Sequence, residues 1–321
     1  MMKEYCRPVV VVSKCLGFDH CRYNGQIIAD DFVEKLTEYV DYVTTCPEME
    51  IGLGVPREPV RIVERETVPR LVQSKTELDL TEQMQAFSAS FFDTLDHVDG
   101  FLLKNRSPSC GLTDVKIYGP RGNVLGKGSG LFGQAARERF PKAALEDEGR
   151  LKNYRLREHF LTRLYTLTAF RERKKTGRMK ELVAFHTENK LLFMAYNQDL
   201  LRRLGRIVAN PEKQPASKVM GAYEHVLDLM FAAPPSYKPN INVMMHILGY
   251  FSKRLDHQEK HYLLDLLEKY RKGKVPLSVP LHVLYSWVVR FEEPYLVRQT
   301  YFMPYPESLV EITDSGKGRA G

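Results

Sequence analysis

The sequence predicts two domains, an α/β domain over residues 1–150 and an all-α domain over residues 151–312. The length of 321 residues is enough for two domains that each bury a core. Short β-branched runs alternate with helical patterns in the first half, which is typical of a small, mostly parallel sheet with flanking helices. Long helical patterns fill the second half. Residues 313–321 are predicted to be a disordered tail.

Continuous apolar runs in the first half predict strands that are buried on both faces. The clearest are Pro8–Val12 and Val98–Lys104. The glycine-rich stretch Gly122–Gly130 lacks the spacing of a P-loop or a dinucleotide-binding fingerprint and is predicted to be a loop. A helix is predicted from about Asp30, because apolar residues recur there on one face: Phe32, Leu36, Val40 and Val43.

The second half reads as a series of helices. From Leu151 onward, an apolar stripe formed by Leu156, Phe160, Leu164, Leu167 and Phe170 predicts a long amphipathic helix with arginines on its other face. Further helices are predicted at about Glu181–Tyr196, Gln198–Val208, Ala216–Phe231, Asn242–Arg254, Gln258–Lys272 and Pro280–Phe291. Breaks that contain proline or glycine separate them.

Composition narrows the class of protein. With 43% hydrophobic and 27% charged residues, the chain is typical of a soluble globular protein. No stretch approaches the roughly 18 to 20 apolar residues of a membrane span, and the first residues lack the apolar core of a signal peptide. We therefore expect a cytoplasmic protein with no membrane contact. The five cysteines are an odd number in a reducing compartment, which disfavours a disulfide framework.

The basic character is confined to the second half. Residues 1–150 carry 19 Lys/Arg and 23 Asp/Glu, a net charge of −4, whereas residues 151–321 carry 28 and 17, a net charge of +11. Such a field is suited to a polyanion, and nucleic acid is the natural hypothesis. The residues predicted to contact it are Arg171, Arg173, Lys174, Lys175, Arg178, Lys190, Arg202, Arg203 and Arg206.

Three cysteines follow regular elements of the first half. Cys15 comes after the first strand, Cys46 after the first helix, and Cys110 lies in a turn-rich segment after the second strand. Ligands of open α/β sheets collect outside the carboxyl ends of the strands, so these thiols are expected to converge. Cys6 and Cys21 are interpreted as structural or incidental.

Two resemblances cover nearly the whole chain. The first half resembles the TudS-type thiouracil desulfidases in four blocks: Cys15–Gly17 with Cys21–Gly25, Cys46–Glu48 with Gly52–Arg57, Leu103–Lys104 with Ser107–Gly111, and Gly128–Gly130. The second half resembles the YbgA-type domain in Phe185–Lys190, Leu204–Arg206, Asn242–Phe251, Tyr270–Arg271 and Val275–Pro280. The fused arrangement is similar to bacterial tRNA 4-thiouridine desulfidases. Asn189 stands where a second histidine is expected, which puts any paired-histidine role in doubt.

The resemblance implies an active site. Cys15, Cys46 and Cys110 would hold a [4Fe-4S] cluster with one iron open, which accepts the sulfur as a transient [4Fe-5S] species. Water replaces the sulfur without net electron transfer. Glu48 is expected to activate the water and Ser107 to handle the proton on the pyrimidine nitrogen. Ser109 is a weaker alternative, expected to support the turn at Cys110.

Three functions follow as hypotheses. The leading one is a tRNA 4-thiouridine desulfidase whose helical domain holds the tRNA, with no protein partner expected. The same chemistry on free thiouracil or thiouridine nucleotides is an alternative, although such an enzyme has no need of the basic domain. The last is a non-catalytic, cluster-containing RNA-binding protein or stress sensor, in which Glu48 is dispensable.

Overall fold

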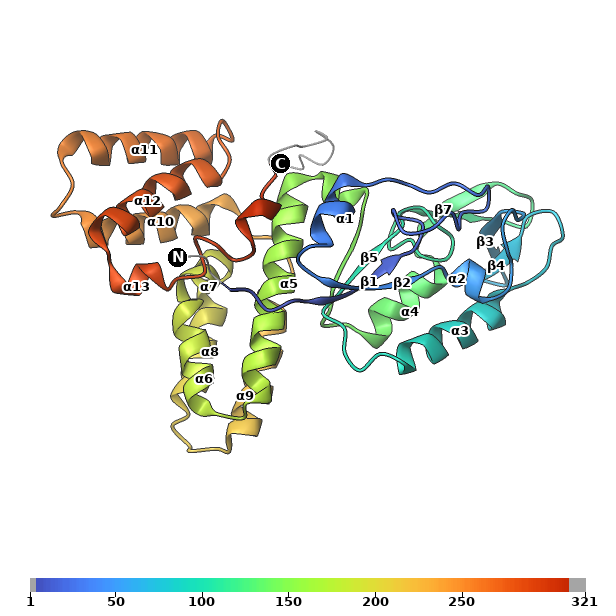
Figure 1. Cartoon of the computed structure of the whole chain (residues 1–321), viewed down its shortest axis with the longest axis horizontal. Coiled ribbons are helices and arrows are strands. Elements are labelled where there is room, and N and C mark those ends of the chain that lie inside the picture. Colours follow the sequence, from blue (N-terminus) through green and yellow to red (C-terminus); the bar gives the residue numbers. More distant parts are fainter. Residues whose placement is uncertain (1–3, 312–321) are drawn as a thin grey trace. The chain divides into compact units, whose positions relative to one another are not determined.

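The computed structural model describes residues 4–311, which form two compact units. Of these residues, the first unit contains 4–168 and 308–311, and the second is Ala169–Glu307. All strands of Figure 1 belong to the first unit, and the second unit is helical, which confirms both predicted fold classes. The division differs from the predicted boundary at residue 150, because it falls inside one long helix, α5 (Tyr154–Lys175). The predicted tail, residues 313–321, lies outside the described residues.

The first sheet contains four parallel strands in the order β2-β1-β5-β8. They are β1 (Val9–Ser13), β2 (Asp41–Thr45), β5 (Gly100–Leu103) and β8 (Ala144–Asp147). The predicted strands Pro8–Val12 and Val98–Lys104 correspond to β1 and β5. Both are apolar and buried on both faces, as parallel sheets require. The carboxyl ends of all these strands therefore meet at one edge.

The predicted helix from Asp30 to Val43 is correct only in its first part. The helix α1 covers Asp31–Leu36 and is capped by Asp30, which accepts a hydrogen bond of 3.1 Å from the Val33 N–H. The following apolar residues belong to β2, where Val43 lies opposite Val11 of β1. β-branched and aromatic residues favour a strand where a buried partner strand is available, and that pairing outweighs the helical spacing of the apolar residues.

Two helices cover one face of the first sheet. They are α3 (Thr81–Asp93) and α4 (Leu131–Arg139), which pack against each other. Their aromatic residues meet in the core, where the rings of Phe92 and Phe132 are 5.0 Å apart and Phe101 of β5 contacts Phe92 edge-on. Burial of each such ring contributes about 1.5–3 kcal/mol to folding. This packing fixes α4 against the sheet.

A second sheet was not foreseen from the sequence. Its order is β4-β3-β6-β7, built from β3 (Val60–Arg65), β4 (Val68–Gln73), β6 (Val115–Tyr118) and β7 (Val124–Gly128). The predicted loop Gly122–Gly130 is wrong for β7, which pairs antiparallel with β6. Gly128 lies in that pairing, where a Cβ would approach the Ile117 side chain to 2.8 Å. A strand that contains glycines is hard to predict from sequence, because glycine has no side chain and so does not contribute to the alternation of apolar and polar residues.

The long helix α5 follows β8 and a short 3₁₀ turn, η1 (Arg150–Lys152). Its predicted stripe is buried at Phe160, Leu164 and Phe170. Its arginines do not all face solvent, however: Arg157 is 4% exposed and donates hydrogen bonds to the carbonyls of Leu151 and Glu311. The prediction of a helix with a single solvated basic face is therefore wrong at this position.

The second unit is a set of packed helices. They are α6 (Met179–Glu188), α7 (Lys190–Tyr196), α8 (Gln198–Ala209), α9 (Ala216–Met230), α10 (Tyr237–Phe251), α11 (His257–Arg271), α12 (Ser278–Phe291) and α13 (Pro294–Val297), before the 3₁₀ turn η2 (Glu307–Leu309). A core around Phe251, Leu284 and Trp287 joins α10 to α12. Within residues 4–311, no helix combines the length and the apolar character needed to cross a membrane.

Asn189 divides the predicted helix Glu181–Tyr196 into α6 and α7. The residue is 3% exposed, its side-chain amide donates to the Phe185 carbonyl at 2.8 Å, and its oxygen accepts from Thr300 Oγ1 at 2.7 Å. Both ends of its amide are thus satisfied inside the protein. Asn189 joins two segments of the helical unit, which is a structural role.

His186 of α6 packs inside the helical unit. Its Nδ1 lies 3.1 Å from the Tyr223 hydroxyl, and burial, assisted by Lys190, lowers the pKa of His186 to about 4. The unfolded chain binds a proton at this histidine near pH 6.5, whereas the folded unit resists protonation until the pH is much lower. The stability that depends on the neutral imidazole is therefore present above pH 6.5 and is lost as the pH falls toward 4.

We expect the unfolding free energy of the helical unit to fall between pH 7 and pH 5 by about 1 kcal/mol more in the wild type than in His186→Gln. This is roughly half of the unscreened value, because the imidazole is partly exposed. Denaturant unfolding followed by the fluorescence of Trp287, the single tryptophan of the chain, measures it. His225→Gln, at an exposed position of α9, is the control. An identical pH dependence in the wild type and His186→Gln would contradict this account.

Candidate active site

Two of the predicted cluster ligands lie at neighbouring strand ends. Cys46 follows β2 directly, and Cys15 lies two residues beyond β1. The strands are in register to their ends, with Ser13 opposite Thr45, and the Lys14 N–H donates to the Thr45 carbonyl at 2.8 Å. Cys46 is buried and Cys15 is half-buried. The topology thus brings both thiols to the carboxyl edge of the first sheet.

The third cysteine is held by a tight loop beyond β5. Ser107 Oγ accepts hydrogen bonds from the N–H groups of Ser109, at 3.3 Å, and Cys110, at 3.1 Å. Burial raises the pKa of the Cys110 thiol to about 12, while hydrogen bonds with the side chains of Ser13 and Ser107 act in the opposite direction. Ser13 also accepts from the Lys104 N–H at 2.9 Å. The end of β1 and the Cys110 loop are therefore joined through Ser13.

Glycines let helix α4 lie against this loop. A Cβ at Gly130 would approach the Ser109 carbonyl oxygen to 2.5 Å, and one at Gly133 would approach the Cys110 carbonyl oxygen to 2.6 Å. The Gly130 N–H donates to the Gly111 carbonyl at 2.7 Å. Contacts this close exclude any side chain, so these glycines fix the loop between α4 and the sheet.

Cys21 belongs to the same group of thiols, which the interpretation as structural or incidental did not foresee. Its side chain hydrogen-bonds to those of Cys15 and Cys46, and the contact with Cys15 contributes most to raising the pKa of Cys21 to about 11. The contact with Cys21, together with burial, also raises the pKa of the Cys46 thiol. Cys21 is 1% exposed. The sequence held one signal of this proximity, since Cys21 opens the second half of a block that begins at Cys15.

The donor set fits an iron–sulfur cluster. Among residues 4–311, no three His, Cys, Asp or Glu side chains converge closely enough to hold a single metal ion. An iron–sulfur cluster needs ligands that are farther apart than those of a single ion. Each thiolate binds a different iron, and the thiolates surround the whole cluster. Soft thiols from two strand ends and a buried loop supply that chemistry: Cys15, Cys46 and Cys110.

Glu48 contacts the loop that holds Cys110 through a hydrogen bond with Ser109. It lies in the first turn of α2 (Pro47–Glu50), and its Oε1 accepts a hydrogen bond of 2.9 Å from Ser109 Oγ. Its Oε2 accepts from Arg57 Nε at 3.0 Å and from Arg57 Nη2 at 2.7 Å. The Arg57 side chain is 4% exposed and that of Glu48 is 14% exposed. A bidentate pair of this kind fixes both the charge and the direction of the carboxylate.

Arg57 is the site residue that the sequence reasoning missed. Arg57 had no assigned role, although it closes the block Gly52–Arg57, and its Nη1 donates to the Gly54 carbonyl at 2.9 Å. Ser109 was named as the weaker alternative to Ser107 and was expected to support its turn; that its hydroxyl orients Glu48 was not foreseen. Hydrogen bonds over 9 and 61 residues of sequence create these roles, and no local pattern reveals them.

Comparison with known proteins identifies both parts of the chain. Residues 10–148 match a family model described as 2-thiouracil desulfurase. The uncharacterized protein YbbK of Bacillus subtilis (strain 168) is 34% identical over 111 residues, which are 32% of this chain and 73% of YbbK. The chain belongs to the 2-thiouracil desulfurase family. Removal of sulfur from a thiouracil is the activity that the description of this family names.

The helical part has relatives of its own. Residues 190–306 match a family model described as a protein of unknown function, DUF1722. The uncharacterized protein YbgA of Escherichia coli (strain K12) is 28% identical over 158 residues, which are 49% of this chain and 93% of YbgA. A solved [4Fe-4S]-dependent thiouracil desulfidase, TudS, is 29% identical and covers 45% of this chain and 93% of its own, with a TM-score of 0.36. Both resemblances stated from the sequence are confirmed.

In this family member, the residues predicted to bind nucleic acid belong to the segment from the end of α5 to α8, with Arg178 just before α6. Most of them form ion pairs within the chain: Arg171 and Lys175 with Glu172, Arg173 with Glu181 and Glu188, Lys174 with Glu224, Arg178 with Glu181, and Arg202 with Asp199. Lys190, Arg203 and Arg206 are exposed and have no ion-pair partner in the described part of the chain. The densest basic run is thus largely neutralised by its own acidic neighbours, and its role in RNA binding stays a prediction.

Proposed function

We propose that this protein is a tRNA 4-thiouridine desulfidase that exchanges the sulfur of the thiolated base for the oxygen of water. The reaction consumes one thiocarbonyl and one water and yields one carbonyl and one hydrogen sulfide, so no oxidant or reductant is required. The observation that carries the proposal is the position of Glu48, whose carboxylate is hydrogen-bonded to the loop that holds Cys110. It brings a proton acceptor to the group of cysteines in a member of a desulfurase family.

Cys15, Cys46 and Cys110 are the residues that would hold a [4Fe-4S] cluster, of the kind on which the related TudS depends. Bound there with three thiolates, it supplies a Lewis-acidic iron for the sulfur of the substrate. The protein fixes these ligands through β1, β2 and the Cys110 loop. Cys21 is buried and its side chain contacts two of them, Cys15 and Cys46.

The remaining steps fall to side chains. Glu48 accepts a proton from the attacking water, and Arg57 and Ser109 hold its two oxygens in place. Ser107, which contacts both the backbone and the thiol of Cys110, serves the proton on the pyrimidine nitrogen. A hydroxyl can both give and take a proton in a hydrogen bond, which suits a nitrogen that changes its protonation during the exchange.

The helical unit supports the choice of tRNA over a free base. Residues 169–307 carry 22 Lys/Arg and 14 Asp/Glu, a net charge of +8. A thiolated base in folded RNA must be unstacked at a cost of a few kcal/mol, which backbone contacts elsewhere offset. Exposed ion pairs such as that of Arg202 with Asp199 stabilise a fold by at most about 1 kcal/mol, so phosphates can replace the acidic partner at little cost.

The test is direct. Anaerobically reconstituted protein is incubated with tRNA that contains 4-thiouridine and, separately, with free 4-thiouracil, and the near-ultraviolet absorbance of the thiocarbonyl is followed. We expect the absorbance to fall fastest with tRNA, and this advantage to shrink as salt is raised. Turnover of the free base alone refutes the tRNA assignment, and no turnover of either refutes a desulfidase.

A further inference from the structure

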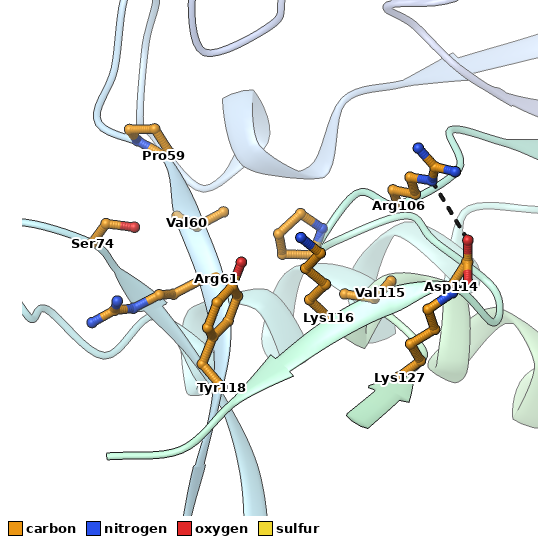
Figure 2. A pocket seen from close by; sticks show the side chains of 11 residues that line it. Pro59, Val60, Arg61, Ser74, Arg106, Asp114, Val115, Lys116, Tyr118 and Lys127 are labelled. Atoms are coloured by element: carbon orange, nitrogen blue, oxygen red, sulfur yellow. Dashed lines mark hydrogen bonds and ion pairs between the residues drawn. The ribbon is translucent and has the colours of Figure 1, made fainter. Parts of the chain in front are cut away.

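A pocket of about 630 Å³ opens in the first unit (Figure 2). Its walls come from β3, β6 and β7 of the second sheet and from the loop that carries Arg106 and Pro108. Ser107 lies between these two residues in the chain, and consecutive Cα atoms are about 3.8 Å apart. One wall of the pocket is therefore the segment that holds a residue assigned to catalysis.

Four of the eleven residues that line this pocket are cationic. Arg61, Arg106, Lys116 and Lys127 line it together with one carboxylate, that of Asp114. Asp114 is shared by two of them, lying 3.5 Å from Arg106 Nε and 2.6 Å from Lys127 Nζ. Glu77 pairs with Arg61 from outside the pocket, so two carboxylates accompany four cations and the pocket keeps an excess of positive charge.

Two of the cations have hydrogen-bonding capacity that the described residues do not use. Lys116 is exposed and has no ion-pair partner among residues 4–311. Arg61 uses its Nη2 on Glu77 at 3.1 Å, but its Nε is buried and has no hydrogen-bond partner in this part of the chain. A buried N–H without an acceptor costs about 1–3 kcal/mol, but this atom is closed to solvent, so the capacity that an anionic ligand can use directly is that of Lys116.

The pocket also has an aromatic wall. The Tyr118 ring lies beneath the Arg61 guanidinium, whose Cζ is 5.9 Å from the ring centroid, and Val115 adds apolar surface near it. Figure 2 shows Tyr118 and Arg61 on one side of Lys116, and Arg106 with Asp114 on the other. Apolar faces beside cations match a sugar with an attached phosphate better than an isolated inorganic ion.

We propose that this pocket is a phosphate subsite, which binds a phosphate on the sugar of the thiolated nucleotide while its base reaches Ser107 and Glu48. The inference rests on the proposed function for the position of the base. It assigns substrate recognition to the desulfurase unit itself, because the cations of the pocket all belong to β3, β6, β7 and the Arg106 loop. A nucleotide, either free or within RNA, is then preferred over a free base or nucleoside.

Binding of reaction products tests the subsite without any turnover. Calorimetric titration of the reconstituted protein with uridine monophosphate and with uridine compares ligands that differ only in the phosphate. We expect Lys116→Ala to weaken binding of uridine monophosphate about tenfold and to leave uridine within twofold. Lys35→Ala, at an exposed position in the last turn of α1, should change neither. Because Lys116 is exposed, its substitution should not disturb folding.

A second arm distinguishes RNA from free nucleotide as the source of the phosphate. In Lys116→Ala, the slope of log affinity for thiolated tRNA against log salt should fall by about one if a strand phosphate occupies the pocket. Equal weakening of uridine and uridine monophosphate would overturn the subsite, as would no weakening of either the mononucleotide or tRNA. These results do not depend on catalysis, so a protein without desulfidase activity that still binds the phosphate would refute the proposed function alone.

Discussion

Replacement of Glu48 by Gln is expected to lower kcat for desulfuration by a factor of about 10²–10⁴, the usual contribution of a positioned general base. Glutamine keeps the shape of the side chain and one oxygen that can accept from Arg57, but its amide nitrogen cannot accept from Ser109 and the side chain cannot take the proton of water. The carboxylate lies between Ser109 and Arg57, so its position needs no rearrangement before reaction. Initial rates of thiocarbonyl loss at saturating substrate measure the effect.

The neighbouring Glu50 provides a matched control, because Glu50→Gln removes a carboxylate from the same short helix at an exposed position. Its kcat should stay within twofold of the wild type. Removal of the charge of Glu48 also leaves the buried Arg57 without its anion, so circular dichroism must show that the variant is folded. A folded Glu48→Gln protein with kcat within threefold of the wild type would exclude Glu48 as the base.

Cys110→Ala should abolish the visible absorbance of the reconstituted protein and reduce its bound iron to background. Cys110 is the most deeply held of the proposed ligands, since its loop is fixed by Ser107 and by the contacts of Gly130 and Gly133 with the loop carbonyls. Two remaining thiolates do not replace three, and the loop offers no other soft donor. Absorbance spectra and iron analysis after anaerobic reconstitution give the answer without reference to activity.

Cys6→Ala is the comparison for this experiment, because Cys6 is exposed and lies before β1. It should bind iron as the wild type does. Cys21→Ala distinguishes a neighbour from a ligand: we expect retention of the absorbance with a shifted spectrum. If Cys110→Ala kept full colour and full iron content, the assignment of the ligands would be wrong.

The sequence could predict the positions of those site residues that directly follow a strand of the parallel sheet. Cys15 and Cys46 follow apolar runs whose pairing in a parallel sheet places them at one edge, and the register of Ser13 with Thr45 bears out that reasoning. Cys46 was nevertheless expected after a helix and follows a strand instead. Its position was recovered for a partly wrong reason, because α1 ends at Leu36 and it is β2, starting opposite Val9, that carries the chain to the edge near Cys15.

The parts that could not be predicted arise from packing across long sequence distances. The salt bridge of Arg57 with Glu48 and the pocket beneath Lys116 both depend on the second sheet or on the loop that leads into it. The strands β6 and β7 of that sheet are short and partly exposed, and β7 contains glycine, so they show little alternation of apolar residues. The basic character of the chain was attributed to the helical half alone. Because residues 1–150 have a net negative charge, the local group of cations around the pocket was not predicted.

The path of the chain makes the helical unit an insertion in the first unit rather than an appendage to it. The chain leaves the first unit within α5 and re-enters it at Ser308, whose hydroxyl donates to Tyr39 Oη at 2.6 Å. A protein cut at residue 150 would therefore lose α5 as well, including the hydrogen bond from Tyr165 to the Tyr39 carbonyl. Production of the desulfurase unit without the helical unit calls for excision of the segment between α5 and Ser308 and rejoining of the cut ends, since simple truncation would remove part of the desulfurase unit.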